Sequence, residues 1–204
     1  MSSARLDRRE RMAQQTRREI LETARKLFAE RGYVATSVSD IAEEAGVAVQ
    51  TIYARLGSKH GLLMGLLDLI DEEGNVSEGA GAVVTASTAA AALKAEIRLT
   101  RVLQQQCGDI IGALLTAAAI EPGLEHAVAE GQRRHRNGAS LTIKRISELG
   151  GLREGLPAAR AAALLSAATS HYAWSELVDA SNLSWSQAEQ TLSDALARAI
   201  LEPH

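Results

Sequence analysis

The residues of this sequence that are best suited to chemistry lie between positions 37 and 59, where the chain reads SVSDIAEEAGVAVQTIYARLGSK. The amide of Gln50 can form two hydrogen bonds with the edge of an adenine, and Val49 beside it can contact the methyl group of a thymine. Lys59 follows Ser58, which we expect to cap a helix, so the lysine charge and the positive helix N-terminus both favour an anion. These side chains are therefore suited to hydrogen bonding with bases and with phosphates.

Two short helices are needed to position these side chains. The hydroxyl of Ser37 can cap the first helix, and Gly46 ends it, because glycine adopts the left-handed backbone of a tight turn without a Cβ clash. The second helix is predicted over about residues 48–56 and buries Ile52 and Leu56. Residues 37–56 thus have helix-turn-helix architecture, in which the second helix can insert its N-terminal residues into the major groove of DNA.

Neighbouring helices complete this N-terminal region and indicate an all-helical chain. Apolar residues recur at spacings of three and four, and alternation with a period of two is absent. One helix is predicted over about residues 16–30, with Gly32 as its stop, and another over 58–73. Their apolar faces consist of Ile20, Leu21, Ala24, Leu27 and Phe28 in the first helix and of Leu62, Leu63, Leu66, Leu69 and Ile70 in the second.

The segment from about residue 14 to residue 74 resembles the tetracycline-repressor-like (TetR) family of transcriptional regulators, and the spacing agrees without a gap. The residues that carry the resemblance are Ala24, Leu27, Phe28, Gly32, Tyr33, Thr36, Ser37, Val38, Ile41, Ala42, Ala45, Gly46, Val47, Thr51, Ile52, Tyr53, Ser58, Lys59, Leu62 and Leu63. The remaining residues fit the family only in length and helical content. The resemblance implies an all-α fold, with a three-helix helix-turn-helix DNA-binding domain over 14–74 and a ligand-binding and dimerisation domain over 75–204.

The resemblance also implies roles for individual residues. Thr51, Tyr53 and Lys59 match positions that contact the phosphate backbone of DNA. Thr36 and Ser37 stand at the start of a helix and are candidates for the same role. Packing on the first helix is the alternative for Tyr53, and capping alone is the alternative for Ser37.

Two pairs of residues depart from the family pattern. Arg55 and Leu56 stand where the family commonly has an aromatic residue or histidine followed by phenylalanine. Leu56 can still fill the core, and Arg55 can add a contact to the DNA backbone. Val49 and Gln50 stand where many relatives have serine or lysine followed by glycine, alanine or proline. Because these two positions face the bases, the operator sequences of relatives do not carry over.

The rest of the chain is predicted to form five more helices, which gives about nine in total. Glycine and serine residues between positions 74 and 87 break the helical pattern and predict a loop there. Pro122 and Pro157 suit the first turn of a helix. The helices expected beyond the loop cover about residues 88–106, 108–120, 122–148, 157–180 and 185–201.

Two sets of residues in this helical body are candidates for binding. The cluster of His171, Tyr172 and Trp174 suits either a ligand pocket or a dimer seam, because Tyr and Trp are enriched in interfaces. The predicted pocket residues are Leu103, Ile110, Leu114, His171, Tyr172 and Trp174. The resemblance implies that the last two helices of each subunit form a four-helix dimer interface, predicted to include Leu164, Leu165, Ala168, Trp185, Leu192 and Leu196. The low aromatic content, 3%, favours a modest apolar ligand.

The net charge of −3 hides an uneven distribution along the chain. Residues 1–60 carry 11 Lys/Arg and 8 Asp/Glu, whereas residues 61–204 carry 11 and 17. A basic head on an acidic body favours an anionic partner for one end only. The arginines at the start of the chain suit either an arm that reaches the minor groove or a disordered, solubilising tail. They are Arg5, Arg8, Arg9, Arg11, Arg17 and Arg18.

Other classes of protein have no positive support in the sequence. The single cysteine, Cys107, cannot form an internal disulfide, and no spacing of Cys or His predicts a zinc site. The longest stretches without a charged residue have 15 residues, which is short of a bilayer span, and no secretory signal is present. We expect a soluble, cytoplasmic protein that is not an enzyme and needs no metal or cofactor.

These observations together predict a homodimeric, ligand-responsive repressor. Its two recognition helices would lie roughly 34–36 Å apart and read the two halves of a palindromic operator in double-stranded DNA. The alternative is a helical dimeric small-molecule-binding module without operator-specific DNA binding. An enzyme is a third possibility, which would need a convergent polar site that the sequence does not reveal.

Overall fold

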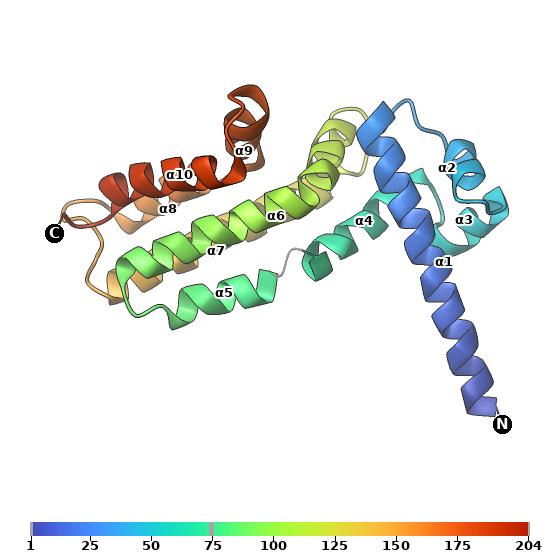
Figure 1. Cartoon of the computed structure of the whole chain (residues 1–204), viewed down its shortest axis with the longest axis horizontal. Coiled ribbons are helices and arrows are strands. Elements are labelled where there is room, and N and C mark those ends of the chain that lie inside the picture. Colours follow the sequence, from blue (N-terminus) through green and yellow to red (C-terminus); the bar gives the residue numbers. More distant parts are fainter. Residues whose placement is uncertain (1, 74–75, 204) are drawn as a thin grey trace. The chain divides into compact units, whose positions relative to one another are not determined.

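The computed structural model describes residues 2–73 and 76–203, apart from the side chains of residues 2–7, 9 and 68–73. The described residues form ten α-helices and one π-helix, without a β-strand (Figure 1). The elements are α1 (Ser2–Arg31), α2 (Val38–Glu44), α3 (Val49–Leu56), α4 (Lys59–Glu73), α5 (Val76–Thr85), α6 (Ala89–Ala118), α7 (Glu125–Glu148), α8 (Ala158–Ala168), α9 (His171–Ser175), the π-helix η1 (Glu176–Ala180) and α10 (Trp185–Ile200). The predicted all-α fold is confirmed.

The chain divides into two compact units, and the first contains the residues up to Leu69 together with Asp109–Glu125. In this unit α2 and α3 pack beside α1 (Figure 1). The apolar face predicted for α1 packs inward, and of the two residues predicted to be buried in α3, Ile52 is fully buried and Leu56 half-buried. Burying each large side chain stabilises the unit by about 1.5–3 kcal/mol. Fully or almost fully buried side chains are Ile20, Leu21, Ala24, Leu27, Ile41, Ile52, Leu62, Leu63, Leu66, Ile110, Ala117 and Leu124.

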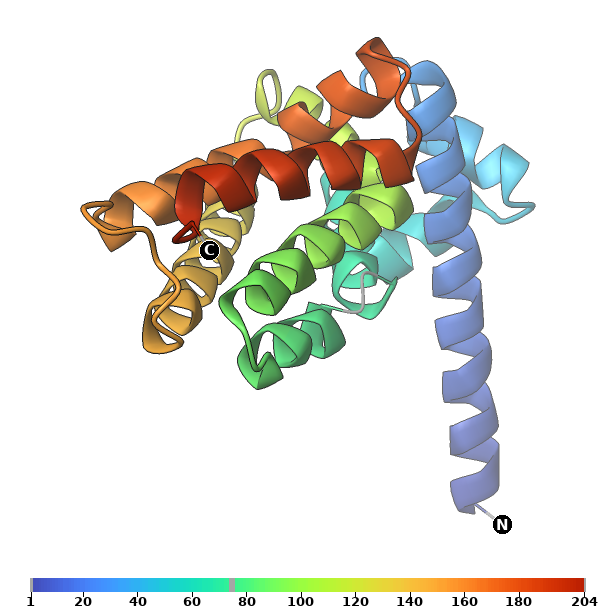
Figure 2. The same cartoon turned by 60° about the vertical axis from the view of Figure 1, so that its left-hand side comes forward.

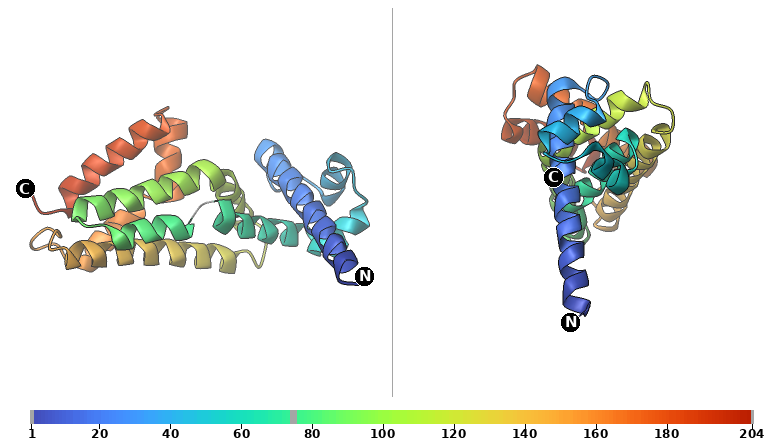
Figure 3. Two further views of the ribbon diagram at one scale, coloured as in Figure 1. Left: turned by 60° about the horizontal axis from the view of Figure 1, so that its bottom comes forward. Right: turned by 90° about the vertical axis from the view of Figure 1, so that its right-hand side faces the viewer.

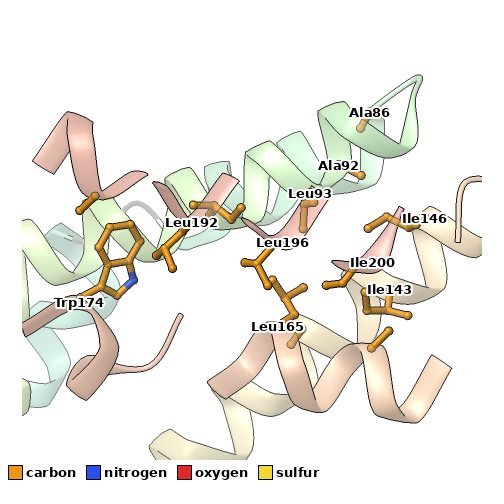
Figure 4. Close-up of a cluster of buried hydrophobic side chains, with 14 residues drawn as sticks. Ala86, Ala92, Leu93, Ile143, Ile146, Leu165, Trp174, Leu192, Leu196 and Ile200 are labelled. Atoms are coloured by element: carbon orange, nitrogen blue, oxygen red, sulfur yellow. The ribbon is translucent and has the colours of Figure 1, made fainter. Parts of the chain in front are cut away.

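The second unit runs from Ile70 to Gly108 and from His126 onward. Its core gathers apolar side chains from α6, α7, α8, α9 and α10 (Figure 4). Leu192, Leu196 and Ile200 succeed one another along α10, as their helical spacing requires, and Trp174 lies at one end of the cluster. Figures 1 and 2 both show α10 alongside α8.

The first helix is much longer than predicted, because α1 begins at Ser2 instead of near residue 16. Residues 2–15 contain no glycine or proline and consist largely of good helix formers. Pairs one turn apart add support, such as the Gln15 side chain, which donates to Glu19 at 2.8 Å. The arginine-rich segment is therefore helical and not a disordered tail. The predicted arm residues Arg5 and Arg9 have side chains that lie outside the described residues.

Helix α5 occupies most of the segment that the sequence predicts to be a loop. Tertiary packing explains the difference, since Val83 is buried in this helix and Ala86 is buried just after it. Gly79 lets α5 approach α6, because a Cβ at this position would lie 2.4 Å from the Leu99 Cδ1 atom. Figure 3 shows α5 alongside α6. The glycine that lowers helix propensity is thus the residue that permits this contact.

Three other boundaries differ from prediction. Helix α6 runs without a break through Cys107 and Gly108, where two helices were expected. Pro122 lies in a turn before α7 and not in its first turn, and Gly123 follows with a φ of +98°. The helix predicted over 157–180 divides after Ala168, because Ser170 caps a new helix by accepting a hydrogen bond from the Ala173 N–H.

The predicted domain boundary falls at residues 74–75, which lie outside the described residues. None of the helices in the described part of the chain is both long and apolar enough to cross a membrane.

Candidate nucleic-acid interface

A capping box fixes the start of α2. The Ser37 hydroxyl accepts a hydrogen bond from the Asp40 backbone N–H at 3.1 Å, and the Asp40 carboxylate accepts from both the Ser37 N–H and its hydroxyl, each at 2.7 Å. These two bonds lower the pKa of Asp40 below its usual value. Both donors of Ser37 are therefore committed to Asp40, so Ser37 caps α2, and its phosphate contact stays a prediction.

The turn between α2 and α3 depends on Gly46. Its φ is +65°, a left-handed conformation that disfavours any side chain. The N–H of Val47 then donates to the carbonyl of Ala42 at 3.0 Å, which closes the end of α2. The tight turn predicted at this glycine is confirmed. Helix α3 therefore leaves α2 in a fixed direction.

Helix α3 has one buried anchor and a polar exposed face. Ile52 is fully buried, whereas Gln50 and Arg55 are exposed and Tyr53 is 51% exposed. Ala48, at the N-cap, offers no side-chain acceptor to the first turn, so the positive end of the helix is not covered by a cap. This helix can present hydrogen-bonding groups to a partner without losing its own packing.

The remaining predicted contact residues on α3 are half-buried. Val49 and Thr51 both keep part of their surface accessible at its N-terminal end. Val49, Gln50, Thr51 and Tyr53 therefore lie on two consecutive turns of one short helix, as a groove-reading helix requires.

Lys59 lies at the start of α4 and is held against Tyr33. Its Nζ lies 4.1 Å from the centre of the Tyr33 ring and donates to the Val34 carbonyl at 3.4 Å. Partial burial lowers the pKa of Lys59, and the negative charge of Glu121 opposes that shift. The cation–π contact restricts the ammonium group to a small region beside the helix-turn-helix.

Thr36 joins the loop before α2 to the end of α1. Its side chain is buried, and its hydroxyl lies 2.9 Å from the Gly32 carbonyl oxygen and 3.2 Å from that of Leu27. A hydroxyl used in this way ties the loop before α2 to the end of α1. The geometry therefore gives no support to the phosphate contact predicted for Thr36.

One feature of the first unit has no signal in the sequence. Arg25 of α1 forms a two-pronged ion pair with Asp109 of α6, with Nε to Oδ2 at 2.6 Å and a terminal nitrogen to Oδ1 at 2.8 Å. The partners are 84 positions apart, so no helical spacing relates them. The Asp109 carboxylate thus holds α1 against this part of α6. Ile110 and Leu114 belong to the same unit.

The residues predicted for the ligand pocket divide between the two units. Ile110 and Leu114 are buried in the first unit. In the second unit Leu103 is half-buried, Trp174 is fully buried and Tyr172 is 68% exposed. His171 Nδ1 donates to Gln104 Oε1 at 2.9 Å, and burial lowers the pKa of His171.

Most of the residues predicted for the dimer interface pack in or against the core of the second unit. Leu165, Leu192 and Leu196 are buried in the core of the second unit, and Ala168 and Trp185 pack partly buried against it. Leu164 is 41% exposed.

Comparison with known proteins gives matches to the N-terminal region and to the whole fold. The sequence profile described as "Bacterial regulatory proteins, tetR family" matches residues 20–65. The HTH-type transcriptional regulator TtgR of Pseudomonas putida is 43% identical over 60 residues, which cover 29% of this chain and 29% of TtgR. The chain thus matches less than a third of the length of this curated relative.

Two solved structures resemble almost the whole chain. A regulator from Saccharomonospora viridis in complex with choline has a TM-score of 0.77 at 24% identity and covers 93% of this chain and 100% of its own. NalD, the secondary repressor of the MexAB-OprM multidrug efflux pump in Pseudomonas aeruginosa, has a TM-score of 0.74 at 18% identity and covers 95% and 100%. At these identities the likeness concerns the fold. The helix-turn-helix region, residues 20–65, thus belongs to the tetR family of bacterial regulatory proteins, and the chain as a whole shares the fold of these two structures.

Proposed function

We propose that the chain is a sequence-specific DNA-binding transcriptional regulator that acts as a ligand-responsive repressor. The observation that carries the proposal is the division of α3 into a buried anchor, Ile52, and an exposed face with Gln50, Tyr53 and Arg55. A helix that keeps polar side chains outward on a rigid support can enter the major groove without refolding. Such a regulator acts on DNA in the cytoplasm and has no catalytic role.

The predicted contact residues divide into two roles in this proposal. Gln50 reads a base edge with its amide, and Val49 contacts a thymine methyl group. Thr51, Tyr53, Arg55 and Lys59 bind phosphates, which set the position of α3 on the duplex but carry no sequence information. Thr36 and Ser37 are left out of this set, since internal hydrogen bonds already occupy their hydroxyl groups.

A homodimer supplies the symmetry that a palindromic operator needs. We place the dimer interface on the outer faces of α8 and α10, because their inner faces are filled by the core of the second unit. Leu164, 41% exposed on α8, is the predicted interface residue that remains available to a second copy. Two-fold symmetry then presents two copies of α3 to two half-sites.

Ligand binding in the second unit would control DNA affinity. A ligand can do so only if it binds one arrangement of the dimer more tightly than the other. The choline complex of the Saccharomonospora viridis protein supports a small-molecule ligand for this fold. If the protein does not bind DNA, the alternative function is that of a helical dimeric small-molecule-binding module.

A gel shift with a random-sequence duplex at increasing salt tests the proposal. Phosphate contacts release counterions, so the logarithm of the association constant should fall linearly with the logarithm of the salt concentration, by about 0.9 per contact. The absence of a shift at low salt would contradict the DNA-binding function and favour the helical dimeric binding module.

A further inference from the structure

The inward face of α6 within the second unit is polar at its centre. Ala92, Leu93 and Ile97 are buried at the N-terminal end of this face, and Cys107 is buried at the other end. A helix face that packs into a core is normally apolar. Between these ends lie Glu96, Thr100 and Gln104, which are one turn apart and expose only 4%, 5% and 9% of their surface. We call these three residues the α6 polar stripe.

Glu96 has little compensation for its charge. Its Oε2 accepts a hydrogen bond from the Thr142 hydroxyl of α7 at 3.1 Å, and within the described residues this is the one hydrogen bond recorded for its carboxylate. Gly138 of α7 faces the other oxygen, and even a Cβ at that position would lie 3.5 Å from Oε1. Among the described side chains no lysine or arginine forms an ion pair with Glu96.

Keeping a carboxylate in this position is unfavourable for the folded protein. Burial raises the pKa of Glu96, and the hydrogen bond from Thr142 and the charge of His135 offset only part of that effect. The single hydrogen bond from the neutral Thr142 hydroxyl compensates only a small part of the hydration that the Glu96 carboxylate loses on burial. A positively charged partner would satisfy the carboxylate far better.

Two histidines lie near the α6 polar stripe, and they differ in charge: His135 acts on the Glu96 carboxylate by its positive charge, whereas His171 leaves room for another cation. The Nε2 of His135 donates to the Ser166 carbonyl at 2.8 Å, because a carbonyl oxygen can only accept. His171 donates from Nδ1 to Gln104, and burial lowers its pKa, which favours the neutral ring. A neutral His171 does not repel a cation. The Thr100 hydroxyl donates to the Ile97 carbonyl at 3.0 Å, so its oxygen and that of the Gln104 amide are the acceptors of the stripe beside Glu96.

We propose that the α6 polar stripe binds a small organic cation, with the Glu96 carboxylate as its counter-ion. The ligand class is a primary or quaternary ammonium ion with a short apolar tail, which differs in its charge from the modest apolar ligand expected from composition. That this cation controls DNA binding rests on the proposed function, whereas the binding itself does not.

Binding of matched ligand pairs to the full-length protein tests the proposal. The probes are choline and hexylammonium, each compared by calorimetry and thermal unfolding with an uncharged counterpart of the same shape, dimethylbutanol for choline and hexanol for hexylammonium. At least one cation should bind and raise the melting temperature more than its uncharged counterpart does. Equal effects of both members of each pair, or no binding of either cation, would overturn the proposal.

Two variants connect the binding to Glu96. Glu96→Gln should weaken the bound cation by about tenfold or more, because it removes the buried charge while keeping the shape. Glu148→Gln makes the same charge change on the surface of α7, where Glu148 pairs with Lys144 and Arg145, and should keep cation affinity. Unchanged affinity in Glu96→Gln would show that the carboxylate is not the counter-ion.

Folding of Glu96→Gln separates a ligand role from a structural one. If Glu96 serves a ligand, its neutral replacement should unfold at the same or a higher temperature at neutral pH without cation. A large drop in melting temperature would assign Glu96 to structure and overturn the proposal. The gel shift of the wild-type protein without cation tests the DNA-binding function separately, so either claim can fail while the other stands.

Discussion

Helix α3 and the central part of α6 both carry polar residues next to apolar ones, but they orient them in opposite directions. In α3 the apolar Ile52 is buried and Gln50 remains in solvent. In α6 the polar Glu96 and Gln104 are themselves buried. An exposed amide is solvated whether or not a partner is bound, whereas a buried carboxylate without a counter-ion destabilises the fold. Polar groups on a surface thus permit binding, while polar groups in a core indicate that something must compensate them.

The largest expected effect comes from removing the anchor of α3. Ile52→Ala leaves a cavity at a fully buried position and should lower the free energy of unfolding by about 2–5 kcal/mol. Chemical denaturation measures the change, and DNA binding should be lost with it. Val34→Ala in the same unit is the control, because Val34 is 66% exposed and its truncation should change stability by about 0.5 kcal/mol or less. Similar losses in both variants would mean that Ile52 does not anchor the helix.

A smaller effect distinguishes the two kinds of DNA contact. Lys59→Ala should weaken binding to all duplexes about equally and reduce the salt dependence by about one counterion. Gln50→Ala should instead cost about 1–3 kcal/mol on the preferred sequence and relax the preference at one base pair. Binding to selected and random duplexes measures both effects. If Gln50→Ala prefers the same sites as the wild-type protein, another residue reads the base.

The smallest effects concern pH, and the two regions should respond with opposite sign. The lowered pKa of Asp40 means that its stabilisation is present above its ordinary pKa and is lost as the pH falls through the folded-state value. The raised pKa of Glu96 means that its contribution is greatest below its ordinary pKa and is lost as the pH rises through the folded-state value. The gain in melting temperature from Glu96→Gln should therefore grow with increasing pH.

Ser37→Ala provides the corresponding test at the capping box. It should cost about 1 kcal/mol at neutral pH, and its effect should shrink in acid as Asp40 is protonated. An effect of Ser37→Ala that is independent of pH would contradict the linkage to Asp40. Thermal unfolding between neutral and acidic pH measures both variants in one series.

Local signals explain how well the first unit could be predicted. Ser37 and Gly46 act through residues close by in sequence, and Ile52 lies on the apolar face that the spacing of α3 indicates; the structure places all three as predicted. The burial of Thr36 could not be predicted, because it depends on carbonyl groups at the end of α1. The pairing of Arg25 with Asp109 likewise depends on tertiary structure.

In the second unit, packing over long distances overrides the local signals. Gly79 suggests a loop by its propensity, yet it allows α5 to lie against Leu99. The spacing of Glu96, Thr100 and Gln104 is visible in the sequence, but their burial is not, because it depends on α7 and on His171. A polar triplet one turn apart would ordinarily be placed on the solvent face.

Selection of genomic fragments by the purified wild-type protein and by Gln50→Ala tests the central claim most directly. The account predicts that the wild-type protein enriches a near-palindromic site whose half-sites lie about one helical turn, or a multiple of it, apart. It also predicts that Gln50→Ala loses preference at one symmetric pair of positions while still binding DNA. Fragments without a shared symmetric site, or no retained fragments at low salt, would contradict a dimeric regulator that reads DNA with α3.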